Sequence, residues 1–230
     1  LEAVLKAHED AKRKLIITDG VFSMDGDIAP LDEVTALAEE YGAMVYVDDC
    51  HGEGVLGEKG AGIVAQFNLQ GKVDFETGSF SKALGVQGGI LAGTEMTRTH
   101  ALNHSRSWLL SGSQPPGVAA AQKAAVEVLM EEPQHHAKLW ENTDYFRKEL
   151  QSLGFDTGAS VTPIIPVMCG ESSVAKAMTK ALGEEGVMAG AIVFPMVGRD
   201  KARIRTQMSA GLSRDDLDEV LRLFEKVGPK

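Results

Sequence analysis

Helix and strand patterns alternate through the first half of the chain, and this alternation constrains the fold more than any other feature. A short apolar run at residues 15–18 is followed by an amphipathic stretch from Leu31 to Tyr41, which Gly42 is expected to end. The next segment, Ala43–Val47, is apolar throughout, as in a strand that is covered on both faces. The alternation predicts an α/β fold with a mainly parallel sheet and helices on both sides. Further strands are expected at residues 73–77 and 89–92.

The second half of the chain changes character after a long helical stretch. This stretch begins at Pro115-Pro116, where proline suits a first helical turn, pauses near residues 131–133 and resumes to about residue 153. The rest has an α+β pattern, with strands expected at 164–168, 191–194 and 202–207 and helices at 172–185 and 213–227. We therefore expect a partial large domain over residues 1–130, a connecting helix over 131–153 and a small C-terminal domain over 154–230.

Length, charge and cysteine content exclude several classes of function. The chain has 230 residues, of which 43% are hydrophobic, enough for a sizeable core. Its net charge of −10 argues against binding to nucleic acid or to an anionic membrane. Cys50 and Cys169 are too few for a disulfide framework and fit a reducing cytoplasm. No apolar run approaches ~20 residues, so no membrane span is expected.

Lys82 and Asp48 form the most informative pair of polar residues. Lys82 lies in a turn of small residues, and Asp48 follows an apolar strand in the run Val47-Asp48-Asp49-Cys50-His51. A lysine in such a turn can lose its proton and form a Schiff base, and an aspartate can hold a pyridinium nitrogen, as in pyridoxal phosphate (PLP) sites. Either residue alone is more simply explained as a turn lysine or a strand-end cap. Together they favour a PLP site at the carboxyl ends of the strands.

Four segments, in order, resemble the α-oxoamine synthases, which are PLP enzymes of the aspartate-aminotransferase fold (fold type I) that join an amino acid to an acyl-CoA. They are residues 19–31, 47–51, 79–85 and 202–210. Within that family the segment Ala202–Ala210 most resembles glycine C-acetyltransferase, also called 2-amino-3-ketobutyrate CoA ligase. This resemblance implies condensation of glycine with acetyl-CoA. The alternative is 8-amino-7-oxononanoate synthase, which uses L-alanine and pimeloyl-CoA in biotin synthesis.

The resemblance implies roles for individual residues. Lys82 matches the Schiff-base lysine, which is also the natural base for the Cα proton. Asp48 matches the partner of the pyridine nitrogen, whereas Asp49 is expected to point the other way and to be structural. His51 matches the residue that contacts the phenolic oxygen of the cofactor. Ser23 is similar to a hydroxyl near that same oxygen.

Further serines match the phosphate site of the family. Ser79 falls where the family uses a hydroxyl for the cofactor phosphate, and Ser81 could do the same. Ser111 and Ser113 precede the expected helix start, where hydroxyls and free backbone N–H groups suit a phosphate. In the family this segment reaches the cofactor of the neighbouring subunit, which implies a homodimer with a shared site.

Two arginines lie close together in the last strand that we expect. Arg205 matches the arginine that binds the carboxylate of the amino acid, for which a guanidinium fork is suited. Arg203 is expected to extend to solvent instead. No metal is expected at the site.

The N-terminal part of the α-oxoamine synthases has no counterpart in this sequence. It normally contributes a residue that stacks on the cofactor ring and a Gly-rich turn near the phosphate. We expect this part to precede Leu1 in the natural polypeptide. A non-catalytic fragment is therefore the alternative from a different class of function.

Overall fold

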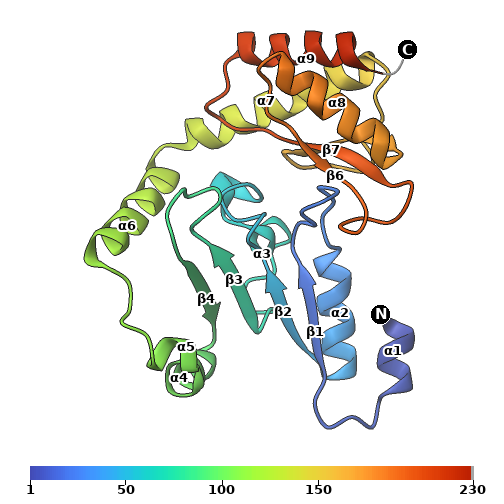
Figure 1. Ribbon diagram of the computed structural model, residues 1–230. Helices are drawn as coiled ribbons and strands as arrows, with labels where there is room; N and C mark the ends of the chain where they lie inside the picture. The colour runs from blue at the N-terminus through green and yellow to red at the C-terminus, as the bar shows by residue number, and fades with distance from the viewer. Residues whose placement is uncertain (229–230) are drawn as a thin grey trace. The chain divides into compact units, whose positions relative to one another are not determined.

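The computed structural model describes residues 1–228, which form two compact units. Unit 1 contains Leu1–Val21 and Ala29–Pro133, and unit 2 contains Phe22–Ile28 and the segment that starts at Gln134. The chain therefore leaves unit 1 at Phe22 and returns to it at Ala29. Figure 1 colours the chain from its N-terminus to its C-terminus.

Unit 1 contains a four-stranded mixed sheet in the order β1-β2-β3-β4. The first three strands are parallel and the last is antiparallel to its neighbour, as the arrows in Figure 1 show. Their bounds are β1 Leu15–Asp19, β2 Met44–Asp48, β3 Phe75–Ser79 and β4 Gly89–Gly93. The register pairs Asp19 with Asp48 and Asp48 with Thr77. The carboxyl ends of three strands therefore meet at one edge of the sheet.

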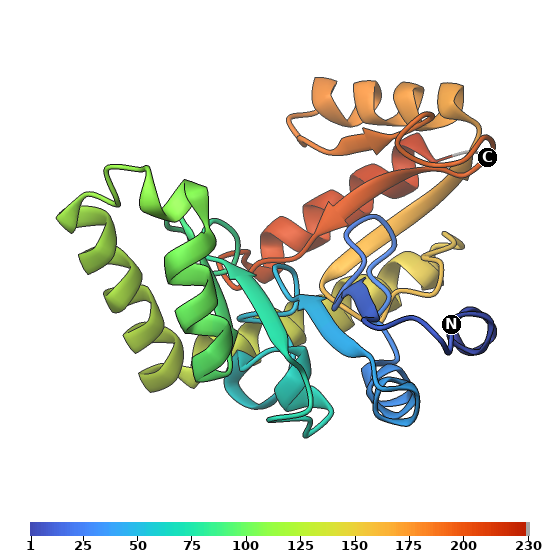
Figure 2. The same ribbon diagram turned by 90° about the horizontal axis from the view of Figure 1, so that it is seen from below.

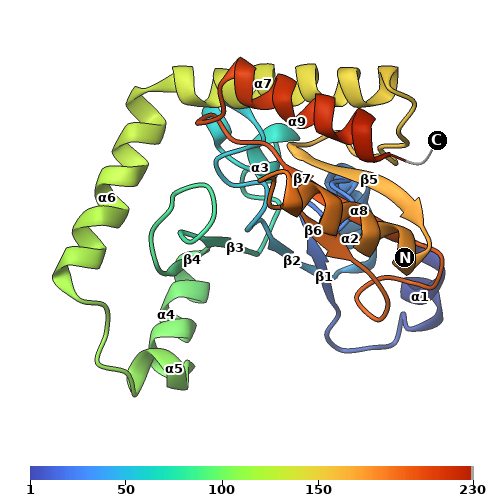
Figure 3. The same ribbon diagram turned by 45° about the horizontal axis from the view of Figure 1, so that its top comes forward.

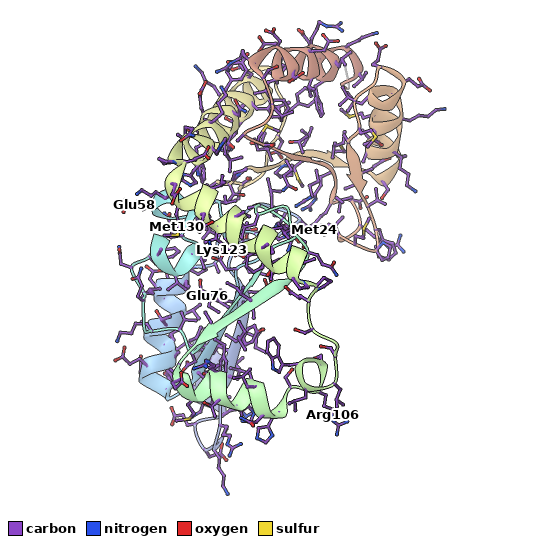
Figure 4. All side chains as sticks on the ribbon, turned by 90° about the vertical axis from the view of Figure 1, so that its left-hand side faces the viewer. Met24, Glu58, Glu76, Arg106, Lys123 and Met130 are labelled. Atoms are coloured by element: carbon purple, nitrogen blue, oxygen red, sulfur yellow. The ribbon has the colours of Figure 1, made fainter. Side chains whose placement is uncertain are left out.

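Helices flank this sheet, and their bounds are α1 Glu2–Ala7, α2 Leu31–Tyr41, α3 Ile63–Gln66, α4 Glu95–His104, α5 Arg106–Leu109 and α6 Pro116–Glu131. Val45 and Val47 of β2 are buried, whereas Met44 is exposed, so the strand alternates instead of being covered throughout. Figure 2 shows α4 and α6 beyond the β4 edge of the sheet. The helix α6 contacts the short 3-10 helix η1, Glu58–Gly60, and Figure 4 shows Glu58 and Met130 there.

Unit 2 contains a three-stranded antiparallel sheet in the order β5-β7-β6, with three helices packed on one face (Figures 1 and 3). The strands are β5 Ile164–Gly170, β6 Gly190–Ile192 and β7 Ala202–Gln207, and the helices are α7 Pro133–Ser152, α8 Ser172–Glu184 and α9 Arg214–Val227. Phe146, Leu182, Ile204 and Phe224 bring one residue from each of four elements into this core. Among the described residues, no helix is long and apolar enough to cross a membrane.

Candidate functional site

Asp48 is the last residue of β2, the middle one of the three parallel strands. Its Oδ1 accepts the backbone N–H of Cys50 at 3.0 Å. Burial alone would raise the pKa of Asp48, but the hydrogen bonds from Cys50 and the charges of Lys82 and His51 outweigh burial and lower it. The carboxyl group is therefore ionised at neutral pH, as a partner for a protonated ring nitrogen has to be.

Lys82 lies in a closed turn that follows β3. The turn is held by the N–H of Phe80, which donates to the carbonyl of Gly88 at 3.0 Å. The charge of Lys82 acts on the carboxyl groups of both Asp19 and Asp48. Lys82 follows the carboxyl end of β3, and β3 pairs with β2 through Thr77 and Asp48, so the amine lies at the same end of the sheet as the two carboxyls.

Two hydroxyl groups lie together at the carboxyl end of β3. The Oγ atoms of Ser79 and Ser81 are 2.7 Å apart, and the N–H of Ser81 donates to the Oγ of Ser79 at 3.2 Å. The N–H of Ser79 donates to the Oε2 of Glu53 at 2.8 Å. A phosphate bound to one hydroxyl would therefore lie beside the other, so both serines fit the role that the sequence left open between them.

The turn after Asp48 carries His51. The N–H groups of Gly52 and Glu53 donate to the carbonyl of Asp49 at 3.0 and 2.9 Å and close this turn. Burial, and then the hydrogen bond and charge of Asp48, raise the pKa of Cys50 to about 11. Its thiol is therefore protonated at neutral pH and is a weak nucleophile.

Asp49 is buried, with 2% of its surface exposed. Its Oδ2 accepts the N–H of Ile63 at 2.8 Å, whereas its Oδ1 has no hydrogen-bond partner within the described residues. Burial raises the pKa of Asp49 to about 7, with further contributions from nearby carboxylates. A Cβ atom at Gly52 would lie 2.0 Å from Oδ1, so only glycine fits there. Asp49 thus joins the turn to α3, in agreement with the structural role expected of it.

Ser111 and Ser113 lie in an exposed segment between α5 and α6. The N–H of Ser113 donates to the Oγ of Ser111 at 3.4 Å. Within residues 1–228 no hydrogen bond joins either serine to the Lys82 turn. Their neighbour Gln114 lies against that turn, since a Cβ atom at Gly88 would lie 2.7 Å from its amide nitrogen.

Arg205 and Ser23 are brought together in unit 2. The Nε of Arg205 donates to the carbonyl oxygen of Ser23 at 2.6 Å. Burial lowers the pKa of Arg205, and no acidic side chain of the described residues forms an ion pair with it. Its guanidinium group therefore retains donors for a carboxylate.

The expectation that Arg203 extends to solvent is wrong. Arg203 is 3% exposed and forms an ion pair with Asp25. Its Nε also donates to the carbonyl of Lys201 at 3.0 Å. The reason is that the loop Phe22–Ile28 covers this face of β7. The side chain of Arg203 therefore packs against this loop instead of extending into solvent.

Sequence reasoning missed two carboxyl groups of this sheet edge. Burial and the charge of Asp48 raise the pKa of Asp19 against the effect of Lys82. Asp19 could have been found because it ends an apolar strand, as Asp48 does. Glu53 reaches Ser79 across the sheet edge, and no local pattern signals that contact.

The family model described as aminotransferase class I and II matches residues 1–224. Among curated proteins, the 8-amino-7-oxononanoate synthase of Thermosipho melanesiensis is 50% identical over 230 residues, which cover 100% of this chain and 59% of the relative. The 8-amino-7-oxononanoate synthase 1 of Bacillus subtilis is 47% identical over 227 residues, which cover 99% of this chain and 58% of the relative. The chain therefore spans less than two thirds of the length of these relatives.

Solved structures of serine palmitoyltransferases share this fold. The serine palmitoyltransferase of Sphingomonas wittichii matches with a TM-score of 0.94 and 30% identity, covering 99% of this chain and 57% of that protein. A serine palmitoyltransferase from S. paucimobilis with bound PLP-myriocin aldimine matches with a TM-score of 0.93 and 29% identity, covering 99% of this chain and 57% of that protein. The expected fold class, PLP-dependent fold type I, is confirmed.

Proposed function

The chain belongs to the aminotransferase class I and II family of PLP-dependent proteins, and we propose that it is part of an 8-amino-7-oxononanoate synthase. The observation that carries this proposal is the 50% identity, over the whole chain, to a curated enzyme of that name. The reaction would join L-alanine to pimeloyl-CoA and release CoA and carbon dioxide. The comparisons thus support the alternative drawn from the sequence better than condensation of glycine with acetyl-CoA.

The residues of unit 1 fit a bound PLP. When bound, PLP supplies an electron sink for the charge left at Cα after a proton is removed. Lys82 would hold the cofactor covalently and then carry the Cα proton on its free amine. The ionised Asp48 would accept a hydrogen bond from the ring nitrogen and keep that nitrogen protonated. His51, in the adjoining turn, would contact the phenolic oxygen.

The remaining groups would bind the phosphate and the amino acid. The adjacent hydroxyls of Ser79 and Ser81 would donate to the phosphate. Arg205 would bind the carboxylate of the amino acid through its guanidinium group, and Ser23 would lie near the phenolic oxygen.

Glycine C-acetyltransferase is the second candidate. The run Arg203-Ile-Arg-Thr-Gln-Met-Ser-Ala210 favours it, although the curated relatives reported above carry the other name. The two activities differ in both substrates, so one experiment separates them.

The test is release of CoA by the PLP-loaded natural protein, measured with L-alanine or glycine against pimeloyl-CoA and acetyl-CoA. We expect turnover with L-alanine and pimeloyl-CoA, together with release of carbon dioxide. Turnover with glycine and acetyl-CoA alone would support the second candidate. No CoA release with any pair, in a protein that retains PLP, would contradict both.

We also propose that the protein is a cytoplasmic homodimer. The apolar run Trp108-Leu109-Leu110 is exposed and directly precedes Ser111. Such a run favours a surface that another polypeptide segment covers. Light scattering of the natural protein tests the dimer. PLP absorbance after its addition to residues 1–230 tests the rival hypothesis of a non-catalytic fragment.

A further inference from the structure

Two arginines of one strand hold the loop Phe22–Ile28. Arg203 and Arg205 are two residues apart in β7 and therefore project from the same face of the sheet. The Nη1 of Arg203 donates to the carbonyl of Met24 at 3.2 Å and forms an ion pair with Asp25. Because Arg203 is buried, this charge needs its acidic partner.

Gly26 fixes the same loop against β5. Its φ is +73°, and a Cβ atom there would lie 2.3 Å from the carbonyl oxygen of Ile164, a backbone atom that has little freedom to move. The Oγ1 of Thr162 donates to the carbonyl of Gly26 at 2.9 Å. The loop is therefore attached to both long strands of unit 2.

The hydrogen bond from Arg205 to this loop determines which N–H donors of Arg205 remain for a substrate. A guanidinium group has five N–H donors, one on Nε and the others on the two Nη atoms. The Nε–H of Arg205 is given to the carbonyl oxygen of Ser23. A carboxylate that binds without displacing the loop must therefore bind end-on, across Nη1 and Nη2.

We propose that the loop Phe22–Ile28, held by the Arg203–Asp25 ion pair, orients Arg205 for end-on binding of the substrate carboxylate. The proposal rests on the proposed function, which supplies an amino acid as substrate. Arg203 and Asp25 are positioning residues in this arrangement. They hold the Ser23 carbonyl, and that carbonyl fixes the plane of the guanidinium group.

The test uses the PLP-loaded natural protein with two variants, Asp25→Ala and Arg203→Lys. The side chain of Asp25 is 52% exposed, so its removal leaves no buried cavity. The control is Arg222→Lys, since Arg222 forms an exposed ion pair with Glu219 within α9. Hydrogen exchange of the loop amides, PLP content, and the KM and kcat for L-alanine are measured in each protein.

Both variants should exchange the loop amides faster. They should also raise the KM for L-alanine by about tenfold, because a misoriented Arg205 would lose one charged hydrogen bond to the substrate carboxylate. PLP content and kcat should stay close to those of the wild type, and the control should change nothing. Unchanged hydrogen exchange of the loop amides in both variants would overturn the claim that the Arg203–Asp25 ion pair holds the loop. Faster exchange with an unchanged KM would overturn its effect on Arg205.

Failure of the proposed function gives a different result. A PLP-loaded wild type that has no affinity for L-alanine or glycine would overturn the proposed function and this inference together. Failure of this inference alone requires wild-type binding that neither variant weakens. If Arg203→Lys does not fold, Asp25→Ala decides the outcome by itself.

Discussion

The Oδ1 of Asp48 accepts the backbone N–H of Cys50 at 3.0 Å, so the turn that leads to His51 folds back onto the carboxylate before it. This contact lowers the pKa of Asp48 together with the charges of Lys82 and His51. The turn therefore favours the ionised carboxylate against the effect of burial, and Lys82 adds to this from the turn that follows β3.

Replacing Asp48 by Asn should remove the charge while retaining the shape. A neutral amide does not keep the ring nitrogen protonated, so exchange of the Cα proton of L-alanine should slow by about 10²–10⁴-fold. Proton exchange in D₂O, followed by NMR, measures this rate. Asp10→Asn, at an exposed position, is the control. A near-normal rate in Asp48→Asn would contradict the assigned role.

Replacing Lys82 by Ala should abolish both turnover and covalent attachment of PLP. Borohydride reduction followed by peptide mapping should label Lys82 in the wild type and no lysine in the variant. Lys72→Ala is the matched control, because Lys72 pairs with Glu39 on the surface. Label found at another lysine in the variant would show that the assignment is wrong.

Asp49 should make stability depend on pH. Its folded pKa of about 7 lies above the ordinary value of 3.8, so between these values the folded state binds more protons than the unfolded state. The free energy of unfolding should therefore fall as pH rises through this range and level off above it, by at most about 4 kcal/mol.

The Asn variant at position 49 cannot titrate, so it should lose this dependence. Urea unfolding at pH 5 and pH 8 gives the comparison, with Asp10→Asn as the control. Parallel pH profiles for the wild type and Asp49→Asn would contradict the high pKa of Asp49.

The N-terminus of α9 offers a test of stability away from the site. Ser213 and Asp216 form a capping box, as their spacing predicts. Ser213→Ala should lower the free energy of unfolding by about 1 kcal/mol, because the N–H of Asp216 loses its acceptor. Ser152→Ala, near the end of α7, serves as the comparison in urea unfolding. Equal midpoints for the two variants would argue against the cap.

Most of the fold could be predicted because its helices and strands bury one face, which leaves a periodic pattern of apolar residues in the sequence. The amphipathic pattern of Leu31–Tyr41 predicted α2 with the bounds that the structure shows. The segment Glu95–His104 forms α4 without burying any residue, so it has no apolar stripe to detect. Residues 1–14 are charged and helical in pattern, but the structure has a helix only over Glu2–Ala7. The chain then continues in turns, in which the N–H of Ala11 donates to the carbonyl of His8 at 3.1 Å.

The candidate site could be predicted for those residues whose role depends on their position at the end of a strand. Asp48 and Lys82 fall just where strands end, and the register then brings them to one edge. The partners of Arg203 and Ser79 were not predictable, because Asp25 and Glu53 reach them through tertiary contacts. A pattern of neighbouring residues carries no information on such distant pairs.

The ion pair between Asp25 and Arg203 joins residues that are 178 positions apart. The entropy lost in closing a loop grows with its length, and such distant contacts slow folding. During synthesis the loop Phe22–Ile28 leaves the ribosome long before β7 is made. The loop therefore cannot form its contacts with Arg203 and Arg205 until most of the chain has been synthesised. A segment of residues 134–230 expressed alone would lack both the loop that covers Arg203 and the acid that pairs with it. Grafting the loop onto that segment would restore both the cover and the ion pair.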